Sequence, residues 1–351
     1  MMKVIGLDVG NGSVCFAVSN EVGASSIEDS YQSVFAEYVP PLAEHAALGL
    51  SKAADVHVFS FGGRDYVLGY EAVRATGGTP ISAYDREDRL RLDTFQTLTK
   101  LALLDAATRD GSHDVMDISL VLGVPVEDFQ RDKLSVLERW FTEPIVGAKN
   151  GQSVILSIKY LKIISQPIAV LMDQYLTTEG YVADKTLESA KVLVIDAGSG
   201  TLDMTEFNDL AMGARFGEAI GMNDVYRQIV ANIQRENPKV RVNVHDLEYQ
   251  LRNQDGQLRL EFEYGASMLD ITTITRLAME RVWTQMEQFV TARYPDRTMY
   301  KQIFVAGGTG QAFADRFRAW SEAFELVRDP QLSIARGMAK FGVWKTRESR
   351  G

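Results

Sequence analysis

The sequence contains a single cysteine, Cys15, so no disulfide bond can form within the chain. This scarcity is typical of proteins of the reducing cytoplasm, and we expect Cys15, in the apolar run 13–18, to be a small buried side chain. No stretch approaches the roughly 20 apolar residues that cross a bilayer, and the chain begins with a strand-like segment rather than a signal peptide. We therefore expect a cytoplasmic protein without a membrane partner.

Basic residues are also in short supply. The chain has 37 Lys and Arg against 47 Asp and Glu, a formal net charge of -10, whereas contacts with nucleic-acid phosphates require clustered basic side chains. We therefore expect no direct binding of nucleic acid. The four histidines lack metal-ligand spacing, and we interpret them as structural or surface residues: His45, His57, His113 and His245.

The length of 351 residues predicts two domains or one large α/β unit, and a hydrophobic content of 46% is typical of a globular protein. Hydrophobic periodicity indicates where the elements lie, although residues 20–50 show no firm period. Strands are expected at 3–8, 13–19, 55–61, 65–69, 118–124, 192–196 and 302–306. Helices are expected at 92–107, 128–141, 166–176, near 222–233, at 272–292 and at 333–344. Ser165 is expected to cap the helix that begins at Gln166, and the polar stretch 177–191 separates the halves.

The most informative feature is an internal repeat. Residues 5–14 (IGLDVGNGSV) align without gaps to residues 193–202 (LVIDAGSGTL), an offset of 188 residues (position 193 against position 5). Both copies read as an apolar strand, an aspartate, a glycine turn and a hydroxyl residue. One long-period copy is typical of two domains of similar architecture rather than of a solenoid.

Such turns have a specific chemistry. Glycines let the backbone approach a bulky anion, and successive N–H groups form a nest for phosphate oxygens. An aspartate ending each strand would repel a phosphate unless a cation intervened, and Mg²⁺ prefers few carboxylates together with phosphate oxygens and water. For either copy alone an ordinary hairpin turn is an equal interpretation, but two copies in register favour a phosphate and Mg²⁺ site.

A third glycine turn, 307–310, follows the strand 302–306 and is suited to a nucleoside that packs flat on its backbone. The three turns, in this order, resemble the phosphate 1, phosphate 2 and adenosine motifs of the actin, Hsp70 and sugar-kinase superfamily. Residues 165–170 and 332–338 resemble its two connecting helices. The length and the segment 62–72 are most similar to the bacterial and archaeal actin-like plasmid-segregation proteins, the ParM family.

The resemblance implies an actin-like fold, in which two similar RNase H-like domains, each split into subdomains, enclose a nucleotide cleft. The first domain would span residues 1–165, with a small subdomain inserted at about 25–110. The second would span 166–335, and residues 336–351 would form a helix that returns to the first domain.

The resemblance also implies which residues form the nucleotide and Mg²⁺ site. Asp8 and Asp196 would hold a hydrated Mg²⁺, and Gln166 would orient the attacking water, because a glutamine is too weak a base to take its proton. These three are the expected catalytic residues. Contacts with ATP, or with GTP as the alternative, are expected from Gly10, Asn11, Gly12, Ser13, Gly198, Ser199, Gly200, Thr201, Gly307, Gly308 and Thr309.

Several residues are less well defined. Asp203 matches an aspartate in the chaperone form of the second motif, but capping at the surface is an equal interpretation. Actins carry a histidine shortly after the second motif's aspartate, and this chain has none there. Ribose or base contacts are considered for Glu218, Asn223, Arg276 and Glu280, the last two of which fit a solvated helix face better.

The function implied by the resemblance is a filament-forming ATPase in plasmid or DNA segregation or a related cytoskeletal task, with itself as partner in a polar filament and a DNA-bound adaptor as a second partner. Two alternatives are a non-polymerising nucleotide-dependent scaffold and a small-molecule kinase of the same fold. A kinase would need a carboxylate base beside an acceptor pocket, and no acceptor motif is visible in the sequence.

Overall fold

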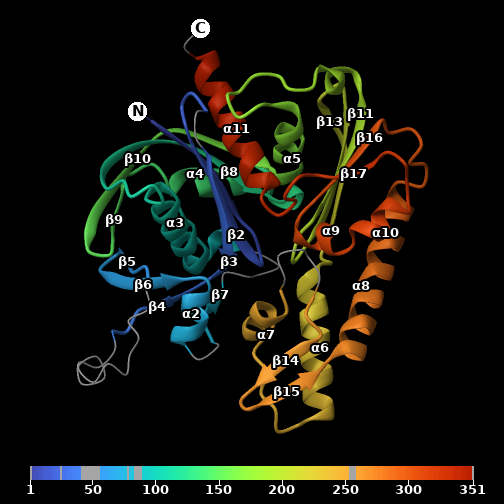
Figure 1. The fold of residues 1–351 in the computed structure, drawn as a ribbon. Helices are drawn as coiled ribbons and strands as arrows, with labels where there is room; N and C mark the ends of the chain where they lie inside the picture. Colours follow the sequence, from blue (N-terminus) through green and yellow to red (C-terminus); the bar gives the residue numbers. More distant parts are fainter. Residues whose placement is uncertain are drawn as a thin grey trace.

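A computed structural model describes residues 2–23, 26–40, 56–76, 79–82, 89–252 and 258–349. Two β-sheets lie on either side of a pair of helices, and further helices cover their outer faces (Figure 1). Two predicted positions, His45 and Asp55, lie outside the described residues.

The first sheet is built from the N-terminal half of the chain. The inner strands β1 and β8 are parallel and buried on both faces, which explains their continuous apolar runs. In spatial order the ten strands are β3 (Ser26–Gln32), β2 (Ser13–Asn20), β1 (Lys3–Val9), β8 (Asp114–Val124), β10 (Gln152–Ser165), β9 (Ile145–Lys149), β5 (Phe59–Phe61), β6 (Arg64–Leu68), β4 (Val34–Glu37) and β7 (Ile81–Ser82).

The second sheet repeats the first five positions of that order. Its first three strands form an antiparallel meander, and the next two are parallel to the central strand, as in the first sheet. The order is β13 (Ala211–Glu218), β12 (Leu202–Asn208), β11 (Lys191–Ala197), β16 (Gln302–Ala306) and β17 (Phe324–Leu326). The internal repeat of the sequence therefore corresponds to two sheets of one topology. A separate hairpin pairs β14 (Glu261–Tyr264) with β15 (Ser267–Asp270).

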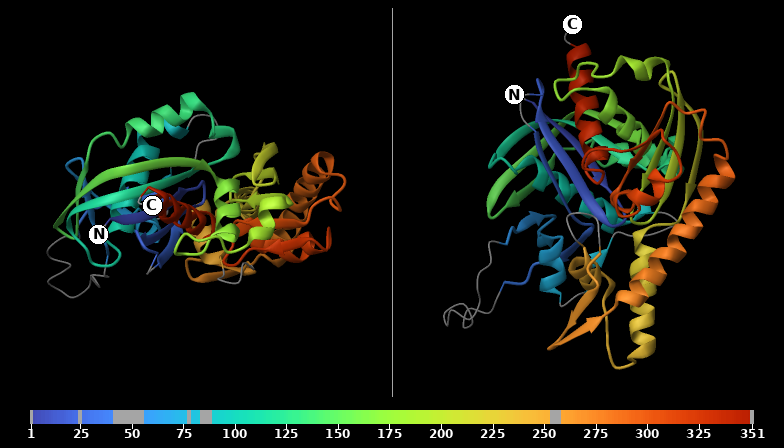
Figure 2. Two further views of the ribbon diagram at one scale, coloured as in Figure 1. Left: turned by 90° about the horizontal axis from the view of Figure 1, so that it is seen from above. Right: turned by 45° about the vertical axis from the view of Figure 1, so that its right-hand side comes forward.

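The helices divide between the middle and the outside of the molecule. Helices α5 and α11 lie between the two sheets, whereas α8 lies on the outer side of the second sheet in all three views (Figures 1 and 2). The α-helices are α2 (Tyr70–Ala75), α3 (Asp93–Ala107), α4 (Arg131–Arg139), α5 (Gln166–Tyr175), α6 (Met222–Glu236), α7 (Val244–Leu251), α8 (Thr272–Arg293), α9 (Gly308–Ala312), α10 (Ala314–Arg318) and α11 (Ser333–Glu348). Short 3₁₀ helices are η1 (Arg89–Arg91), η2 (Val126–Asp128) and η3 (Lys185–Ser189).

The two central helices cross at a glycine. A Cβ atom on Gly337 of α11 would lie 1.8 Å from the carbonyl oxygen of Ala169 in α5, and one on Gly6 of β1 would lie 2.1 Å from that of Ala335. These positions accept no side chain, because α11 packs directly on both α5 and β1. The last helix of the chain is thereby joined to its first strand.

A buried ion network locks the same crossing. The Arg336 guanidinium donates to both carboxylate oxygens of Asp173, each at 2.8 Å, and to Glu28 of β3 at 3.0 Å. Ser333 and Lys340 also contact the Asp173 carboxylate. Paired and hydrogen-bonded in this way, the buried charges are compensated, and α11 is bound to both α5 and β3.

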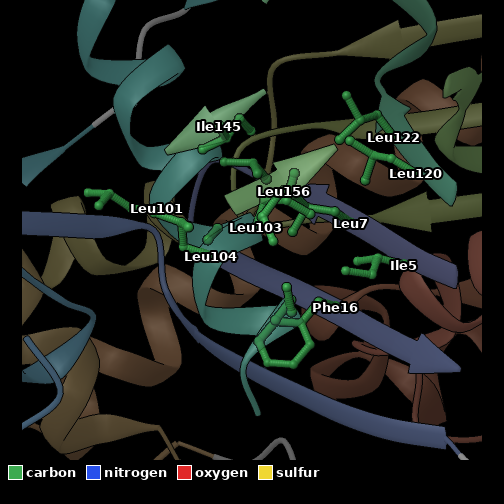
Figure 3. Close-up of a cluster of buried hydrophobic side chains, with 14 of the residues drawn as sticks. Ile5, Leu7, Phe16, Leu101, Leu103, Leu104, Leu120, Leu122, Ile145 and Leu156 are labelled. Atoms are coloured by element: carbon green, nitrogen blue, oxygen red, sulfur yellow. The ribbon is translucent and has the colours of Figure 1, made fainter. Parts of the chain in front are cut away.

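The core of the first half lies between its sheet and α3. Leucines from the helix meet alternate residues of the central strands, as the close-up in Figure 3 shows for Leu103, Leu104, Leu7 and Leu156. A second core packs α6 and α8 against the five-stranded sheet, and a third unites both sheets through α5 and α11. Cys15 is 3% exposed and free, so its predicted burial is confirmed.

Some local features differ from the predictions. Residues 26–37, where no period was found, form β3 and β4. The helix expected over 128–141 is confirmed as α4, which is shorter than expected at both ends. Ser165 occupies the N-cap position of α5, but its hydroxyl makes no capping bond and has no partner among the described residues. Ser165 is also the last residue of β10, and it is fully buried there.

Candidate functional site

The two glycine turns have the same backbone structure. In the first, the Gly10 N–H donates to the Ser13 carbonyl at 2.9 Å, and in the second the Gly198 N–H donates to the Thr201 carbonyl at 2.9 Å. Each turn closes an antiparallel hairpin, β1–β2 and β11–β12, whose register begins directly beside it. The predicted pair of matching hairpins is confirmed.

The turns face each other across one narrow cavity of about 60 Å³. They approach so closely that a Cβ atom on Gly12 would lie 2.2 Å from the Ser199 hydroxyl oxygen. Of the residues expected to be catalytic or to contact ATP, the cavity brings together all except Thr309: Asp8, Gly10, Asn11, Gly12, Ser13, Gln166, Asp196, Gly198, Ser199, Gly200, Thr201, Gly307 and Gly308.

A wider cavity of about 590 Å³ adjoins the narrow one and shares Ser199, Arg252, Gly308 and Gln331 with it. Thr309 lines it, together with apolar and aromatic side chains from α6 such as Tyr226. Its volume and mixed lining are those of a small-molecule site. The two cavities together form a channel that is wide at one end and narrow between the two turns.

Both aspartates at the narrow end are buried, with 6% of Asp8 and 4% of Asp196 exposed. Burial raises the pKa of Asp8 to about 6, although the hydrogen bond from Gln166 and the charge of Arg89 act in the opposite direction. Burial also raises the pKa of Asp196, and the neighbouring carboxylates of Asp203 and Asp8 raise it further. The site therefore holds negative charge at a cost that a cation would relieve.

Gln166 is fixed by Asp8. The Gln166 Nε2 donates to Asp8 Oδ1 at 2.7 Å, and both side chains are buried. The position follows from the fold: β10 ends at Ser165 beside β8, and α5 begins at Gln166 over the carboxyl ends of these strands. The amide is held next to the first turn, where its orientation is set by a carboxylate.

Asp203 is not a surface cap. It is 1% exposed and lies directly opposite Asp196 in the β11–β12 register, so both side chains point to the same face of the sheet. Burial raises the pKa of Asp203 to about 7, although a hydrogen bond with Thr201 acts against it. The surface interpretation was wrong because it ignored the register that places Asp203 behind the site.

The third turn is tied to the second. Gly307 has a φ of 84°, and a Cβ atom there would lie 2.2 Å from the Ala197 carbonyl oxygen. The Thr309 hydroxyl donates to the Gly198 carbonyl at 2.7 Å and accepts from the Met222 N–H at 3.2 Å. Its side chain thus holds the second turn and α6 in place, while the neighbouring glycines line the cavity.

Comparisons with known proteins agree with this architecture. Residues 6–168 match the family described as "Actin like proteins N terminal domain". Over its full length the chain resembles the native structure of Ta0583, an archaeal actin homolog, with 17% identity, a TM-score of 0.74 and complete coverage of both chains. The chain has the actin-like fold. The predicted resemblance and fold class are confirmed.

Two ParM structures are also similar to this actin-like chain. A 15-stranded ParM filament from Clostridium botulinum matches with 15% identity and a TM-score of 0.75, over 97% of this chain and 99% of that one. ParM from Bacillus thuringiensis with ATP matches with 16% identity and a TM-score of 0.67, over 100% of both chains. A further structure of Ta0583 is a complex with ADP, with 16% identity, a TM-score of 0.69 and 100% coverage of both chains. No curated protein matches the sequence.

The actin-like chain has three site residues that the sequence did not indicate. Arg252, at the end of α7, donates from both terminal nitrogens to the Ser13 hydroxyl at 3.2 Å. Gln331 donates to the same hydroxyl at 3.2 Å, and Arg89 reaches the Asn11 side chain at 3.2 Å. All three line the narrow cavity. These long side chains reach the cavity from segments distant in the sequence, so no local motif indicates them.

Of the residues considered for ribose or base contacts, one lies beside the site and three lie away from it. The Asn223 N–H donates to the Ser199 carbonyl at 2.8 Å, which puts it beside the second turn. Arg276 and Glu280 lie on the solvated face of α8, where Glu280 pairs with Arg316, and Glu218 is exposed at the end of β13. Among the described residues that line the two cavities, Arg276, Glu280 and Glu218 are absent.

A magnesium ion fits the residues present at the narrow end. Asp196 Oδ1 is buried and has no hydrogen-bond partner among the described residues, which is the state of an oxygen that awaits a ligand. In the described parts of the chain, no three His, Cys, Asp or Glu side chains gather into a direct ion cage. Two carboxylates that share a cavity with two glycine turns suit a hydrated Mg²⁺ held partly by water and by the oxygens of a ligand.

In the described ranges, no helix combines the length and the hydrophobicity that crossing a bilayer requires. The histidines lie apart from both cavities in the described chain: His57 and His113 are exposed, and His245 is partly buried on α7.

Proposed function

We propose that this chain binds ATP with Mg²⁺ between its two glycine turns, hydrolyses it, and assembles into polar filaments whose stability depends on the bound nucleotide. The observation that carries the proposal is the pair of matching turns on opposite sides of one cavity, each preceded by a buried aspartate. The ParM filament and the ATP and ADP complexes among the similar structures support it.

The cavities suggest how the nucleotide lies. The nucleoside would occupy the wider cavity beside Tyr226 and Gly308, and the phosphates would extend into the narrow end, where the turns present backbone N–H groups. GTP is the alternative nucleotide.

The residues at the narrow end would act by position and charge. Asp8 and Asp196 would hold the hydrated Mg²⁺, which supplies positive charge against the phosphate oxygens. Gln166, fixed by its bond to Asp8, would hold the attacking water in line with the terminal phosphate. Catalysis of this kind depends on placement rather than on a strong base.

Nucleotide binding can control assembly only if it favours one arrangement of the two halves. Contacts that would respond to such a change cross the cleft. Tyr70 of α2 stacks on Tyr249 of α7 with ring centroids 3.4 Å apart, and Gln32 of β3 donates to Glu248 at 3.2 Å and to the His245 carbonyl at 3.0 Å. Opening of the cleft would break these contacts, whereas ATP bound to both halves would keep them formed and fix the outer surfaces for association.

We place the protein in the cytoplasm, with plasmid or DNA segregation as its cellular task and a DNA-bound adaptor as its second partner. The experiment records light scattering and phosphate release together after Mg-ATP is added. We expect scattering to rise above a critical concentration, phosphate release to follow, and polymer to sediment.

Two variants of site residues and one control variant test which residues are needed for hydrolysis. Asp196→Ala and Gln166→Ala should keep polymer while phosphate release falls by about 100-fold or more. Asp117→Asn, which alters only an exposed pair with Lys159, should behave as the unaltered chain. Absence of polymer with every nucleotide would refute the filament. Release of ADP that depends on an added acceptor would instead support a kinase, and binding without turnover would support a scaffold.

A further inference from the structure

Arg89 is a buried cation at the narrow end of the cavity. It begins η1, just before α3, and its side chain is 6% exposed. The guanidinium lies 5.0 Å from the centre of the Phe95 ring, which supports one face of its plane. An arginine cannot lose its proton in a protein, so its charge and its five donors persist in this enclosed position.

The hydrogen bonds of Arg89 leave one nitrogen unused. Nε donates to Asp128 at 3.3 Å, and Nη1 donates to the Val9 carbonyl at 3.4 Å and to the Asn11 side chain at 3.2 Å. Nη2 is buried and has no partner among the described residues. A buried donor of a charged group without a partner is costly, and such groups are rare unless a ligand completes them.

Arg89 shares its ion-pair partner. One oxygen of Asp128 pairs with Arg89 Nε at 3.3 Å, and the other accepts from Lys133 at 2.8 Å. The charge of Arg89 also acts to lower the pKa values of Asp8 and Asp203, so it offsets part of the negative charge of the site. An anion that entered the cavity would complete the hydrogen bonding of Arg89 through Nη2.

The geometry points to the terminal phosphate of a bound nucleoside triphosphate as that anion, and we propose that Arg89 distinguishes the triphosphate from the diphosphate. This inference rests on the proposed nucleotide binding. Arg89 lines the narrow cavity together with Asp8, Gln166 and Pro125, and none of these four lines the wider cavity. A nucleotide whose nucleoside fills the wider cavity reaches Arg89 last, with the phosphate furthest from its base.

Arg89 would also transmit the presence of that phosphate. Its Nη1 bonds to Val9 and Asn11 brace the first turn, and the same guanidinium is tied through Asp128 to the segment that precedes α4. Loss of the terminal phosphate would remove the ligand of Nη2 and leave the guanidinium with its protein partners alone.

The test measures binding by titration calorimetry with Mg²⁺, using a non-hydrolysable ATP analogue and ADP, at protein concentrations below assembly. For Arg89→Gln we expect affinity for the analogue to fall roughly 10- to 100-fold, the range of a charged hydrogen bond, while affinity for ADP changes less than about threefold. Arg91→Gln is the matched control, because Arg91 is an exposed residue of the same η1 turn outside the narrow cavity. It should leave both affinities unchanged.

Arg89→Lys keeps the positive charge, and it tests whether Arg89 distinguishes the triphosphate from the diphosphate if Arg89→Gln does not fold. Lysine has a single nitrogen and cannot hold the first turn and a phosphate at once, so triphosphate affinity should again fall more than ADP affinity. An equal loss for both nucleotides, or no loss, in the folded variant would overturn the role of Arg89 while leaving nucleotide binding intact. An unaltered chain that binds neither nucleotide would overturn the proposed function, and this inference with it.

Discussion

Replacing Asp8 by asparagine should make the nucleotide-free protein more stable and less able to bind Mg²⁺ with nucleotide. Asp8 is buried, and its pKa is raised from 3.8 to about 6. The native state therefore binds the Asp8 proton more tightly than the unfolded chain does, so ionisation of Asp8 destabilises the fold as pH rises. Asparagine removes that charge and keeps an oxygen that can accept the hydrogen bond from Gln166.

The magnitude follows from the pKa values. Above pH 7 the full difference applies between the pKa of Asp8 in the unfolded chain, 3.8, and its pKa in the native state, about 6. This difference corresponds to about 3 kcal/mol of unfolding free energy. At pH 4 the aspartate is largely protonated in the native state and about half protonated in the unfolded state, so the gain falls below about 1 kcal/mol. The advantage of Asp8→Asn should thus be large at pH 8 and small at pH 4.

Urea denaturation at several pH values measures this gain, with Asp117→Asn as the control for a carboxylate in an exposed pair, which should change stability by less than about 1 kcal/mol. In the same assay Mg-ATP at 100 times its dissociation constant should stabilise the unaltered chain by about 2.7 kcal/mol and Asp8→Asn by much less. Equal stability of the two proteins at pH 8, or a gain that does not change with pH, would refute the reasoning.

Two further predictions concern the crossing of the central helices. Gly337→Ala places a Cβ atom 1.8 Å from the Ala169 carbonyl oxygen and should lower the free energy of unfolding by roughly 1–3 kcal/mol, as measured in urea. Arg336→Met removes the main partner of the buried Asp173 carboxylate and should cost about 3–5 kcal/mol, measured as a shift of the thermal midpoint, with Lys340 limiting the loss.

Each of these has a control. Gly213→Ala alters an exposed strand position where the new atom meets nothing closer than 3.4 Å, and Arg328→Met removes an exposed pair with Asp329. Both should change stability by less than about 1 kcal/mol. Destabilisation of the controls equal to that of Gly337→Ala and Arg336→Met would mean that the crossing has no special role.

The parts of the fold that the sequence predicted are those with local signals. Strands β1 and β11 are continuous apolar runs that end in an aspartate and a glycine turn, and such turns are determined by neighbours in the chain. Strand β3 was missed because its sequence SIEDSYQ is polar, and its half-buried side chains receive their strand conformation from pairing with β2. Tertiary pairing overrode local preference there.

The site residues also differ in how far the sequence predicted them. Glycines of the turns are recognisable because only they allow the close approach seen between Gly12 and Ser199. Arg252 was missed because it reaches Ser13 across 239 positions of sequence, and its own segment has no motif. Asp203 lies close to a motif in sequence, yet its burial depends on the β11–β12 register, which composition does not reveal.

The repeat supplies a symmetric cradle, but its neighbours make the two halves chemically different. Cys15 and Asp203 are equivalent positions, each paired opposite the aspartate of its own strand. Asp8 therefore faces a neutral thiol and has Gln166 and Arg89 to support its charge, whereas Asp196 faces a second carboxylate and has an oxygen without a partner in the described parts of the chain. Asp8 is the carboxylate that ionises more readily and can hold a cation first. Asp196 gains most from that cation, because the added positive charge offsets both its burial and the neighbouring carboxylates.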